Sequence, residues 1–226
     1  MSTLLFPKRN GELIELMDNP ACDPGKLANT YRYFATINAL VAGWRSIYLT
    51  YIRPLQPRTL LDIGCGGGDI VRQLATWAKQ DGLELTCTAI EPDQRAINFA
   101  LSLASPANIH FLQADAAELV KQGKTFDIVI SNHVLHHLES QELRRFCELS
   151  EKLSLELALH NDIRRHDLAY LAFSLTAPFF RKSFITPDGL TSIKRSYTQQ
   201  ELAGAVPDKW QVKAGLPFRN LLIFRK

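Results

Sequence analysis

Short apolar runs alternate with amphipathic stretches between residues 57 and 160. Four of these runs have the length and aliphatic character of buried strands; they are Thr59–Ile63, Leu85–Ile90, Ile109–Leu112 and Phe126–Ile130. Apolar positions at helical spacing between and after them predict helices over Ile70–Lys79, Arg95–Leu103 and Gln141–Leu153. Strands that alternate with helices predict an α/β fold, a doubly wound parallel sheet with helices on both faces. A fifth run, Leu155–Leu159, fits a strand or a helix almost equally well.

The chain before this region is expected to be helical. Asp23 followed by Pro24 suits an N-cap and the first turn of a helix. Apolar residues then recur at helical spacing until Pro54 and Pro57 end the pattern. Residues 1–56 are therefore expected to form an N-terminal helical cap.

The part of the chain directly after residue 160 fits no simple strand–helix unit. Residues 162–194 are expected to form an insertion, largely helical up to Pro178, that acts as a lid over the active-site face, and Asp188-Gly189 predicts a turn within it. Thr198 to Glu201 has the pattern of a capping box that opens a short helix. The segments Gln211–Ala214 and Leu221–Arg225 are expected to pair as a final hairpin.

Composition narrows the class of protein. The chain has 226 residues, 46% of them hydrophobic, which is an ordinary globular composition. Residues 1–9 lack the apolar core of a signal peptide. The four cysteines are far apart and contain no C-x-x-C pair, which suits a reducing cytoplasm better than a disulfide scaffold or a zinc site. No run is long enough to span a bilayer.

Charge is unevenly distributed along the chain. Residues 160–226 carry 11 basic and 5 acidic residues, whereas residues 57–159 carry 9 basic and 14 acidic residues. A basic C-terminal third is compatible with an anionic substrate, nucleic acid or a membrane surface, and equally with a solvated face.

A glycine-rich turn carries the strongest chemical signal. The segment 62–69, Asp-Ile-Gly-Cys-Gly-Gly-Gly-Asp, joins a predicted strand to a predicted helix, where ligands bind in doubly wound sheets. It differs from the G-x-G-x-x-G fingerprint of dinucleotide sites. Asp62 places a carboxylate beside the turn, which suits a zwitterionic ligand better than a pyrophosphate. Glu91, at the end of the second strand, can accept both hydroxyl groups of a ribose, and Asp115 and Asn132 follow the next two strands.

With these motifs in this order, residues 57–160 resemble the core of the class I S-adenosylmethionine-dependent methyltransferases. The resemblance implies a Rossmann-like seven-stranded sheet with an antiparallel last strand, and a methyltransferase domain over residues 57–226. It also implies S-adenosyl-L-methionine as cofactor, with Asp62, Gly64 and Gly66 at its methionine part, Glu91 at the ribose, Asp115 and Ala116 at the adenine and Asn132 near the sulfonium. The full expected set of cofactor-binding residues is Asp62, Gly64, Cys65, Gly66, Glu91, Pro92, Asp115, Ala116 and Asn132.

Three histidines follow the fourth strand and include candidate general bases. On a helix, His133 and His137 share a face, and both are expected in the catalytic site. The alternative is that His136 and His137 begin a helix and pack or cap it. His166 and Asp162 are further candidate bases. Arg164 and Arg165 could steer an anionic or phenolate substrate, or simply start an exposed helix. A metal site is not expected, because no acidic residue is spaced as in H-E-x-x-H.

The segments Asn161–Arg165 and Phe218–Asn220 look similar to small bacterial methyltransferases that act on hydroxylated aromatic or polyketide-like compounds. This resemblance implies methyl transfer to a small hydroxylated, aromatic metabolite. Separately, the apolar stretch 168–180 is expected either to form a lid helix over an apolar acceptor with a lipophilic tail or to pack on the core like any buried helix. The alternatives are N- or C-methylation, a non-catalytic cofactor-binding module and an NAD-dependent oxidoreductase. Nucleic acid is disfavoured as a partner because N-P-P-[YF] and a Pro-Cys pair are absent from the sequence.

Overall fold

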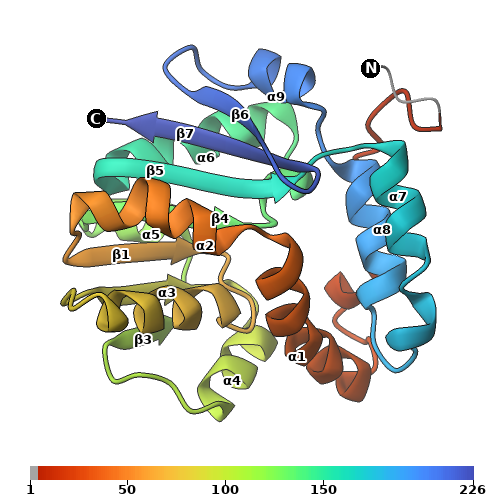
Figure 1. Ribbon diagram of the computed structural model, residues 1–226, viewed down its shortest axis with the longest axis horizontal. Coiled ribbons are helices and arrows are strands. Elements are labelled where there is room, and N and C mark those ends of the chain that lie inside the picture. Colours follow the sequence, from red (N-terminus) through yellow and green to blue (C-terminus); the bar gives the residue numbers. More distant parts are fainter. Residues whose placement is uncertain (1–4) are drawn as a thin grey trace.

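The computed structural model describes residues 5–226, and its centre is one seven-stranded sheet (Figure 1). The strand order is β3-β2-β1-β4-β5-β7-β6. Strands β1 to β5 pair in parallel, and β7 runs antiparallel to both of its neighbours. The strands are β1 Thr59–Ile63, β2 Thr86–Ile90, β3 Ile109–Leu112, β4 Phe126–Asn132, β5 Ser154–Ile163, β6 Gln211–Gly215 and β7 Arg219–Arg225. The predicted Rossmann-like sheet with an antiparallel last strand is confirmed.

Helices cover both faces of this sheet (Figure 1). On one face, the segment containing α2 packs with α3 against the sheet, and on the other face α5, α6 and α9 do so. The helices are α1 Pro24–Val41, α2 Trp44–Ile47, α3 Asp69–Gln80, α4 Gln94–Ser102, α5 Ala116–Lys121, α6 Ser140–Leu153, α7 Asp167–Ser174, α8 Ile185–Arg195 and α9 Gln199–Ala205. Each predicted capping signal is present, since Asp23 caps α1 and Thr198 and Glu201 form the capping box of α9.

The N-terminal segment shares its core with the sheet. Trp44, Tyr48 and Ile52 are buried in the same apolar cluster as Leu60 of β1 and Val71 of α3. These residues therefore have no core of their own, and the domain boundary expected at residue 56 stays a prediction. No helix in residues 5–226 is long and apolar enough to cross a membrane.

Residues 155–159 form a strand, one of the two readings that the sequence left open. That strand, β5, runs to Ile163, so the expected start of the insertion at residue 162 lies inside it. The prediction of a turn at Asp188-Gly189 is wrong, because both residues lie inside α8. The Asp188 carboxylate accepts hydrogen bonds from the backbone N–H groups of Leu16 and Met17 at 2.7 and 3.0 Å. Partners distant in the sequence therefore hold Asp188 in α8, although Asp-Gly locally favours a turn.

The strand order fixes where a ligand can enter. It reverses between β1 and β4, whose following helices cover opposite faces. In open α/β sheets the crevice at such a reversal, outside the carboxyl ends of the strands, is the binding position. Helices α1, α7 and α8 lie beyond these strand ends and face them (Figure 1).

Candidate active site

A cavity of ≈ 970 Å³ opens at the carboxyl ends of the parallel strands and is closed by residues of α1, α7 and α8. The glycine loop and Glu91 line one end, and apolar side chains such as Ile37, Phe173 and Ile185 line another. The sequence-predicted residues that line it are Asp62, Gly64, Cys65, Gly66, Glu91, Pro92, Asp115, Ala116, Asn132, His133 and His137. The structure therefore brings together residues from four strand ends, while the role of each stays a prediction.

The glycine loop has a backbone that other residues fit poorly. Gly64 has φ of +71°, and a Cβ there would lie 2.7 Å from the Val134 side chain. Gly66 has φ of +51° with open space where a Cβ would be, and its N–H donates to Glu91 at 3.0 Å. Glycine adopts such left-handed backbone without the strain that a side chain brings. The loop thus exposes backbone to the cavity, and Glu91 also accepts the N–H of Asp93 at 3.1 Å.

Three acidic groups gather at this end of the cavity. Burial raises the pKa of Asp62, Asp69 and Glu91, and the charges of Asp69 and Glu91 raise that of Asp62 further. Asp62 is 1% exposed, and both of its carboxylate oxygens are without a hydrogen-bond partner in residues 5–226. Burying an unpaired carboxylate is costly, so this end of the cavity favours a cation. The residues fit the ammonium group of a zwitterionic methionine moiety.

The other residues predicted to contact the cofactor differ in exposure and in the hydrogen bonds that they already make. Asp115 is exposed and caps α5, with Oδ1 accepting the N–H of Glu118 at 2.9 Å. Asn132 Oδ1 accepts from Trp44 Nε1 at 3.1 Å and from Arg219 Nη2 at 3.0 Å. Burial raises the pKa of the Cys65 thiol well above its usual range, which keeps it protonated and unreactive.

His133 does not have the helical position expected from the sequence. Its φ is +63°, and it precedes a short 3-10 turn, Leu135–His137, so it shares no helix face with His137. Its Nε2 accepts from Arg219 Nη1 at 2.9 Å, since a guanidinium can only donate. Burial and the Arg219 charge hold the pKa of His133 well below its usual range. The prediction of His133 as a general base is therefore corrected: its one lone pair is already occupied.

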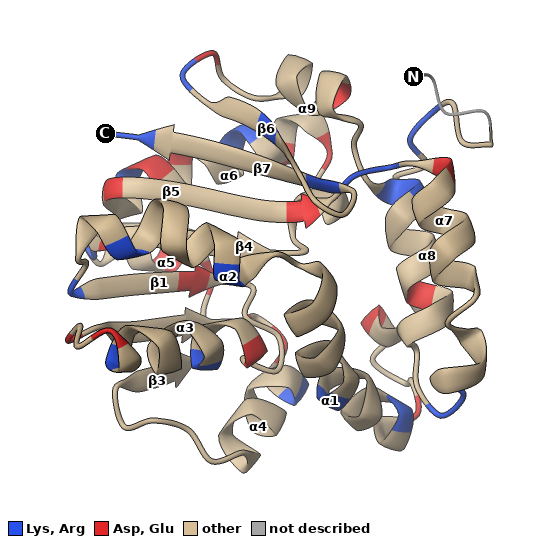
Figure 2. Cartoon of the chain, in the orientation of Figure 1, with Lys and Arg blue, Asp and Glu red and all other residues tan. Residues whose placement is uncertain are grey.

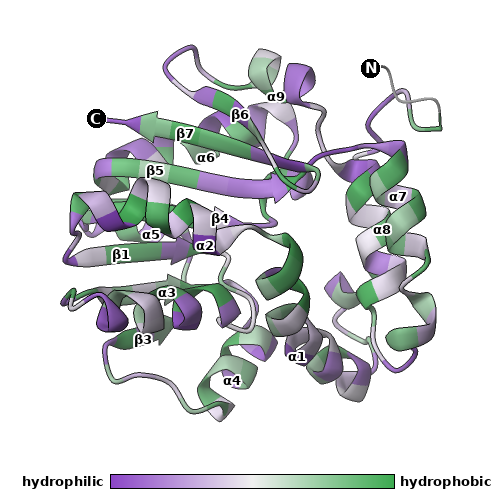
Figure 3. Ribbon diagram, viewed as in Figure 1, coloured by the Kyte–Doolittle hydropathy of each residue, from purple (hydrophilic) through white to green (hydrophobic). Residues whose placement is uncertain are grey.

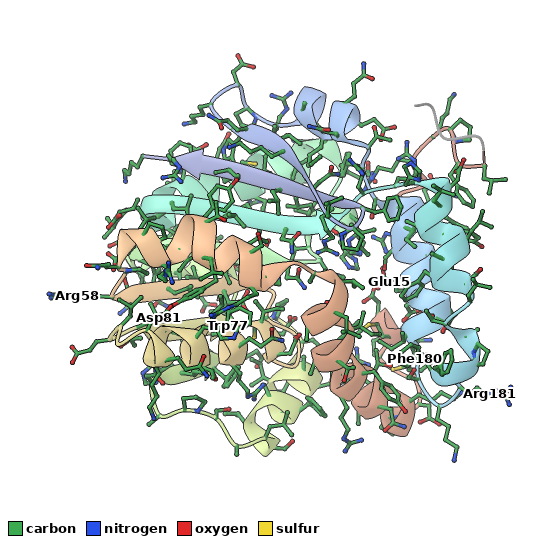
Figure 4. All side chains as sticks on the ribbon, viewed as in Figure 1. Glu15, Arg58, Trp77, Asp81, Phe180 and Arg181 are labelled. Carbon is green, nitrogen blue, oxygen red and sulfur yellow. The ribbon has the colours of Figure 1, made fainter. Side chains whose placement is uncertain are left out.

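His136 is the charged histidine of the three, and its charge was not expected from the sequence. It is 2% exposed, with Nδ1 donating to Asp162 at 2.8 Å and Nε2 donating to Glu15 at 3.2 Å. Burial alone would lower the pKa of His136, but the two carboxylates outweigh it and raise the pKa to about 9. Burial opposes ionisation of Glu15 too, yet the hydrogen bond and charge of His136 hold its pKa at about 2. The N-terminal segment thus supplies a buried acid to the cavity wall (Figure 4).

His137 lines the cavity as a neutral imidazole. Burial and the neighbouring His136 charge lower the pKa of His137 to about 4. Its Nε2 lies 3.9 Å from Glu15 Oε1, and its ring is 4.2 Å from the ring of His136. Ligand atoms of Glu15, His136 and His137 lie within 4.8 Å of one another. Both nitrogens of His136 already donate to carboxylates, so this trio lacks a ligand set for a metal.

Arg164 and Arg165 are not among the residues that line the cavity. Arg165 is 1% exposed; its guanidinium donates to the Ser196 carbonyl at 2.7 Å and pairs with Glu201. The backbone N–H of Arg164 donates to the Phe218 carbonyl at 2.7 Å. The prediction that these arginines bind substrate is corrected, because Arg165 instead ties α7 to α9. His166, another candidate base, caps α7 by accepting the N–H of Leu168 at 3.1 Å.

Arg219 lines the cavity, whereas neither Arg164 nor Arg165 does. It lies at the start of β7, is 3% exposed and lines the cavity. Figure 2 shows basic residues at this end of β7, beside the acidic carboxyl end of β5. The sequence marks Arg219 only through the resemblance of Phe218–Asn220 to small methyltransferases. Its burial beside β4 and β5 depends on strand pairing that the sequence pattern does not specify.

Comparisons with known proteins agree with this geometry. Residues 60–153 match the family model of a methyltransferase domain. Ubiquinone biosynthesis O-methyltransferase of Rhizobium leguminosarum bv. trifolii is 34% identical over 92 residues, which are 40% of this chain and 34% of that protein. The Azorhizobium caulinodans protein of the same name is 27% identical over 190 residues, covering 76% and 73% of the two chains. The chain thus spans about a third of the length of the first of these relatives.

Solved structures share the fold at low sequence identity. The plantazolicin methyltransferase BpumL in complex with SAH superposes with a TM-score of 0.62 at 16% identity, over 90% of this chain and 95% of that one. Human N-acetylserotonin methyltransferase in complex with SAM gives a TM-score of 0.63 at 14% identity, over 90% and 56%. These likenesses establish the fold.

Proposed function

Because this chain contains a class I S-adenosylmethionine-dependent methyltransferase domain, we propose that it transfers a methyl group to a small hydroxylated aromatic metabolite. One observation carries the proposal: a single cavity has an acidic, glycine-lined end and an apolar end. The first suits a zwitterionic, ribose-bearing donor, and the second suits an aromatic acceptor. The two ligands can then meet within one cavity.

The residues of the first end have distinct proposed roles. The unpartnered Asp62 carboxylate receives the ammonium group, and the open backbone at Gly66 contacts the methionine chain. Glu91 holds the ribose with the lone pairs that its two backbone donors leave free. Bound there, the cofactor supplies an electrophilic methyl carbon: a bond from the acceptor oxygen forms as the carbon–sulfur bond breaks, and its electron pair stays on sulfur.

The chain's remaining task is to position the acceptor against that carbon. Apolar residues of α1 and α7 line the acceptor end, and hydrophobic stretches of both helices are visible in Figure 3. The neutral ring of His137 lines the same cavity, and we assign it a contact with the acceptor. With a pKa of about 4, His137 is a weak base, so this chain favours acceptors that lose their proton easily.

The acceptor end also leaves room for a lipophilic substituent. Leu168, Leu171 and Leu175 of the α7 segment are 59%, 50% and 76% exposed, and they neighbour Ala169, Ala172 and Thr176, which line the cavity. An alkyl chain leaving the cavity beside α7 would contact these leucines. We therefore propose that the enzyme methylates alkylated phenols faster than small polar phenols. Equal rates for the two kinds of phenol would reject this part of the proposal.

Thermal unfolding with separate ligands tests the proposed function. A ligand at 100 times its dissociation constant stabilises the native state by about 2.7 kcal/mol. We expect S-adenosylmethionine and S-adenosylhomocysteine to raise Tm and NAD to leave it unchanged. Methyl transfer is then measured with a panel of hydroxylated aromatics, with and without alkyl chains. A shift with NAD alone would overturn the proposal, and adenosyl binding without turnover on any acceptor would favour a non-catalytic binding module.

A further inference from the structure

Arg219 is a buried cation held by neutral partners. Its Nε donates to Asn161 Oδ1 at 3.0 Å, Nη2 to Asn132 Oδ1 at 3.0 Å and Nη1 to His133 Nε2 at 2.9 Å. None of the ion pairs found in residues 5–226 includes Arg219. Buried charges are normally paired, because an unpaired one loses its hydration without compensation.

The groups around this guanidinium do not supply the missing anion. Burial lowers the pKa of Arg219 to about 10, and the charge of Asp162 opposes that effect. The Asp162 carboxylate is already engaged by His136, which donates to it from both its ring and its backbone N–H at 2.8 Å. His133, the other titratable neighbour, is neutral. Asp162 therefore acts on Arg219 only at longer range, and none of the ion pairs in the described chain joins a carboxylate to this guanidinium.

The guanidinium also keeps hydrogen-bonding capacity for a ligand. It has five N–H groups, and the three bonds to Asn161, Asn132 and His133 use three of them. One N–H on each Nη atom remains. Arg219 lines the cavity, so a molecule inside it can approach the guanidinium. Donors of a charged guanidinium suit a small anionic oxygen group.

Arg219 lines the cavity beside the end of β4. Asn132, which it contacts, lies at the end of β4, and β4 pairs with β1, the strand that leads into the glycine loop. Pro217 and Phe218, which precede Arg219, line the cavity as well. An oxygen bound to the guanidinium would therefore lie in the cavity beside the end of β4, one strand from the glycine loop.

We infer that Arg219 binds the reacting oxygen of the acceptor as an anion, so that the substrate class is an acidic phenol that reacts as its phenolate. This inference rests on the proposed function and adds the acceptor's charge state to it. The phenol would lose its proton to bulk water on binding, and the phenolate oxygen would then bond to the methyl carbon as the carbon–sulfur bond breaks, with the electron pair left on sulfur. Proton removal by a side chain is not needed, which agrees with the occupied His133 and the weakly basic His137.

Binding of 4-nitrophenol tests the inference on the unaltered protein. Only the phenolate form of this probe is yellow, so its absorbance reports its ionisation directly. We expect the apparent pKa of 4-nitrophenol to fall by about one pH unit or more when it is bound, a tenfold or larger preference for the anion. We also expect neutral 4-nitroanisole to bind at least tenfold more weakly than 4-nitrophenolate. Identical titrations with and without protein overturn the inference.

Variants of Arg219 provide a second readout. Arg219→Gln should restore the ordinary titration of bound 4-nitrophenol, and Arg219→Lys should retain part of the shift because it keeps the charge but loses the planar fork. With a phenol that the enzyme methylates, the acidic limb of kcat, which reports the ionisation of the bound substrate, should move to higher pH in Arg219→Gln. Arg225→Gln, an exposed arginine on the same strand, is the matched control and should match the wild type. An unchanged acidic limb in a folded Arg219→Gln protein overturns the inference.

The outcome separates this inference from the proposed function. The titration is run with and without S-adenosylhomocysteine. If S-adenosylhomocysteine raises Tm and phenols are methylated, but 4-nitrophenol titrates as in water, the proposed function stands and the role of Arg219 fails. If the adenosyl ligands do not bind, the proposed function fails whatever the titration shows.

Discussion

The three histidines after β4 show how strongly a residue's chemistry depends on its partners. His133 is held neutral by burial and Arg219, His136 is charged between Glu15 and Asp162, and the charge of His136 helps to keep His137 neutral. Neighbours in the sequence thus differ by several pH units in their ionisation. The partners decide which of them can exchange a proton near neutral pH.

At the same scale, Asp62→Asn should separate binding from stability. The substitution removes a buried carboxylate that has no hydrogen-bond partner in the described chain, so Tm without ligand should stay the same or rise. The loss of a charged contact should weaken S-adenosylmethionine affinity by about tenfold to a hundredfold. Calorimetric titration gives the affinity, and thermal unfolding gives Tm.

Asp208→Asn is the control for this prediction, because Asp208 is exposed and lies outside the cavity lining. It should bind the cofactor like the wild type. An Asp62→Asn protein with undiminished affinity would show that the ammonium group is held elsewhere.

At the scale of elements, the insertion depends on close packing of α7 against α8. A Cβ on Gly189 of α8 would lie 2.2 Å from the Phe173 ring of α7, and both residues line the cavity. Gly189→Ala should therefore displace the ring, raise KM for the acceptor several-fold and leave cofactor affinity unchanged. Steady-state kinetics with the acceptor and calorimetric titration with S-adenosylhomocysteine give the two quantities.

Gly204 in α9 supplies the matched control. A Cβ there would meet no atom within 4 Å, so Gly204→Ala should leave KM unchanged and stabilise the protein by up to about 1 kcal/mol. If Gly189→Ala also leaves KM unchanged, the α7–α8 packing does not shape the acceptor end.

At the scale of the whole molecule, a buried charge network joins distant segments. Glu15 lies before α1, His136 follows β4 and Asp162 ends β5, while Ser192 of α8 donates to Glu15 at 2.6 Å. The network thereby holds the N-terminal segment and the insertion against the strand ends. Its ionisation should make global stability depend on pH.

His136 determines how the stability of the folded protein changes at alkaline pH. Its pKa is raised from 6.5 to about 9 in the folded protein, so its contribution is fully present below pH 6.5 and is lost as pH rises through 9. The free energy of unfolding should therefore fall between pH 7 and pH 9.5, by an amount on the order of 3 kcal/mol. His136→Gln should lack most of this fall, as followed by denaturant unfolding at each pH.

His110→Gln is the control variant, because His110 is exposed on β3. It should retain the alkaline loss of stability seen in the wild type. A wild-type protein whose stability is flat from pH 7 to pH 9.5 would contradict the charged state of His136.

Local signals predicted most of the sheet and the glycine loop. Strand β1 and helices α3, α4 and α6 match the expected bounds within a few residues, because burial on both faces gives apolar runs and capping residues act on their own helix. The signals failed at Asp188 and did not choose between strand and helix in β5. Asp188 is held inside α8 by backbone donors 171 and 172 residues away, and β5 lies between β4 and β7, where burial overrides any alternating pattern.

The sequence by itself determined the order of elements, the left-handed glycine turn and the acidic residues that follow successive strands, because each depends on residues close together in the chain. Only the tertiary structure decided which arginine faces the cavity and which histidine carries a charge. Arg219 reaches His133 across 86 residues, and Glu15 reaches His136 across 121. Ionisation and charge pairing depend on burial and on partners at such separations, and local sequence patterns carry no information about either.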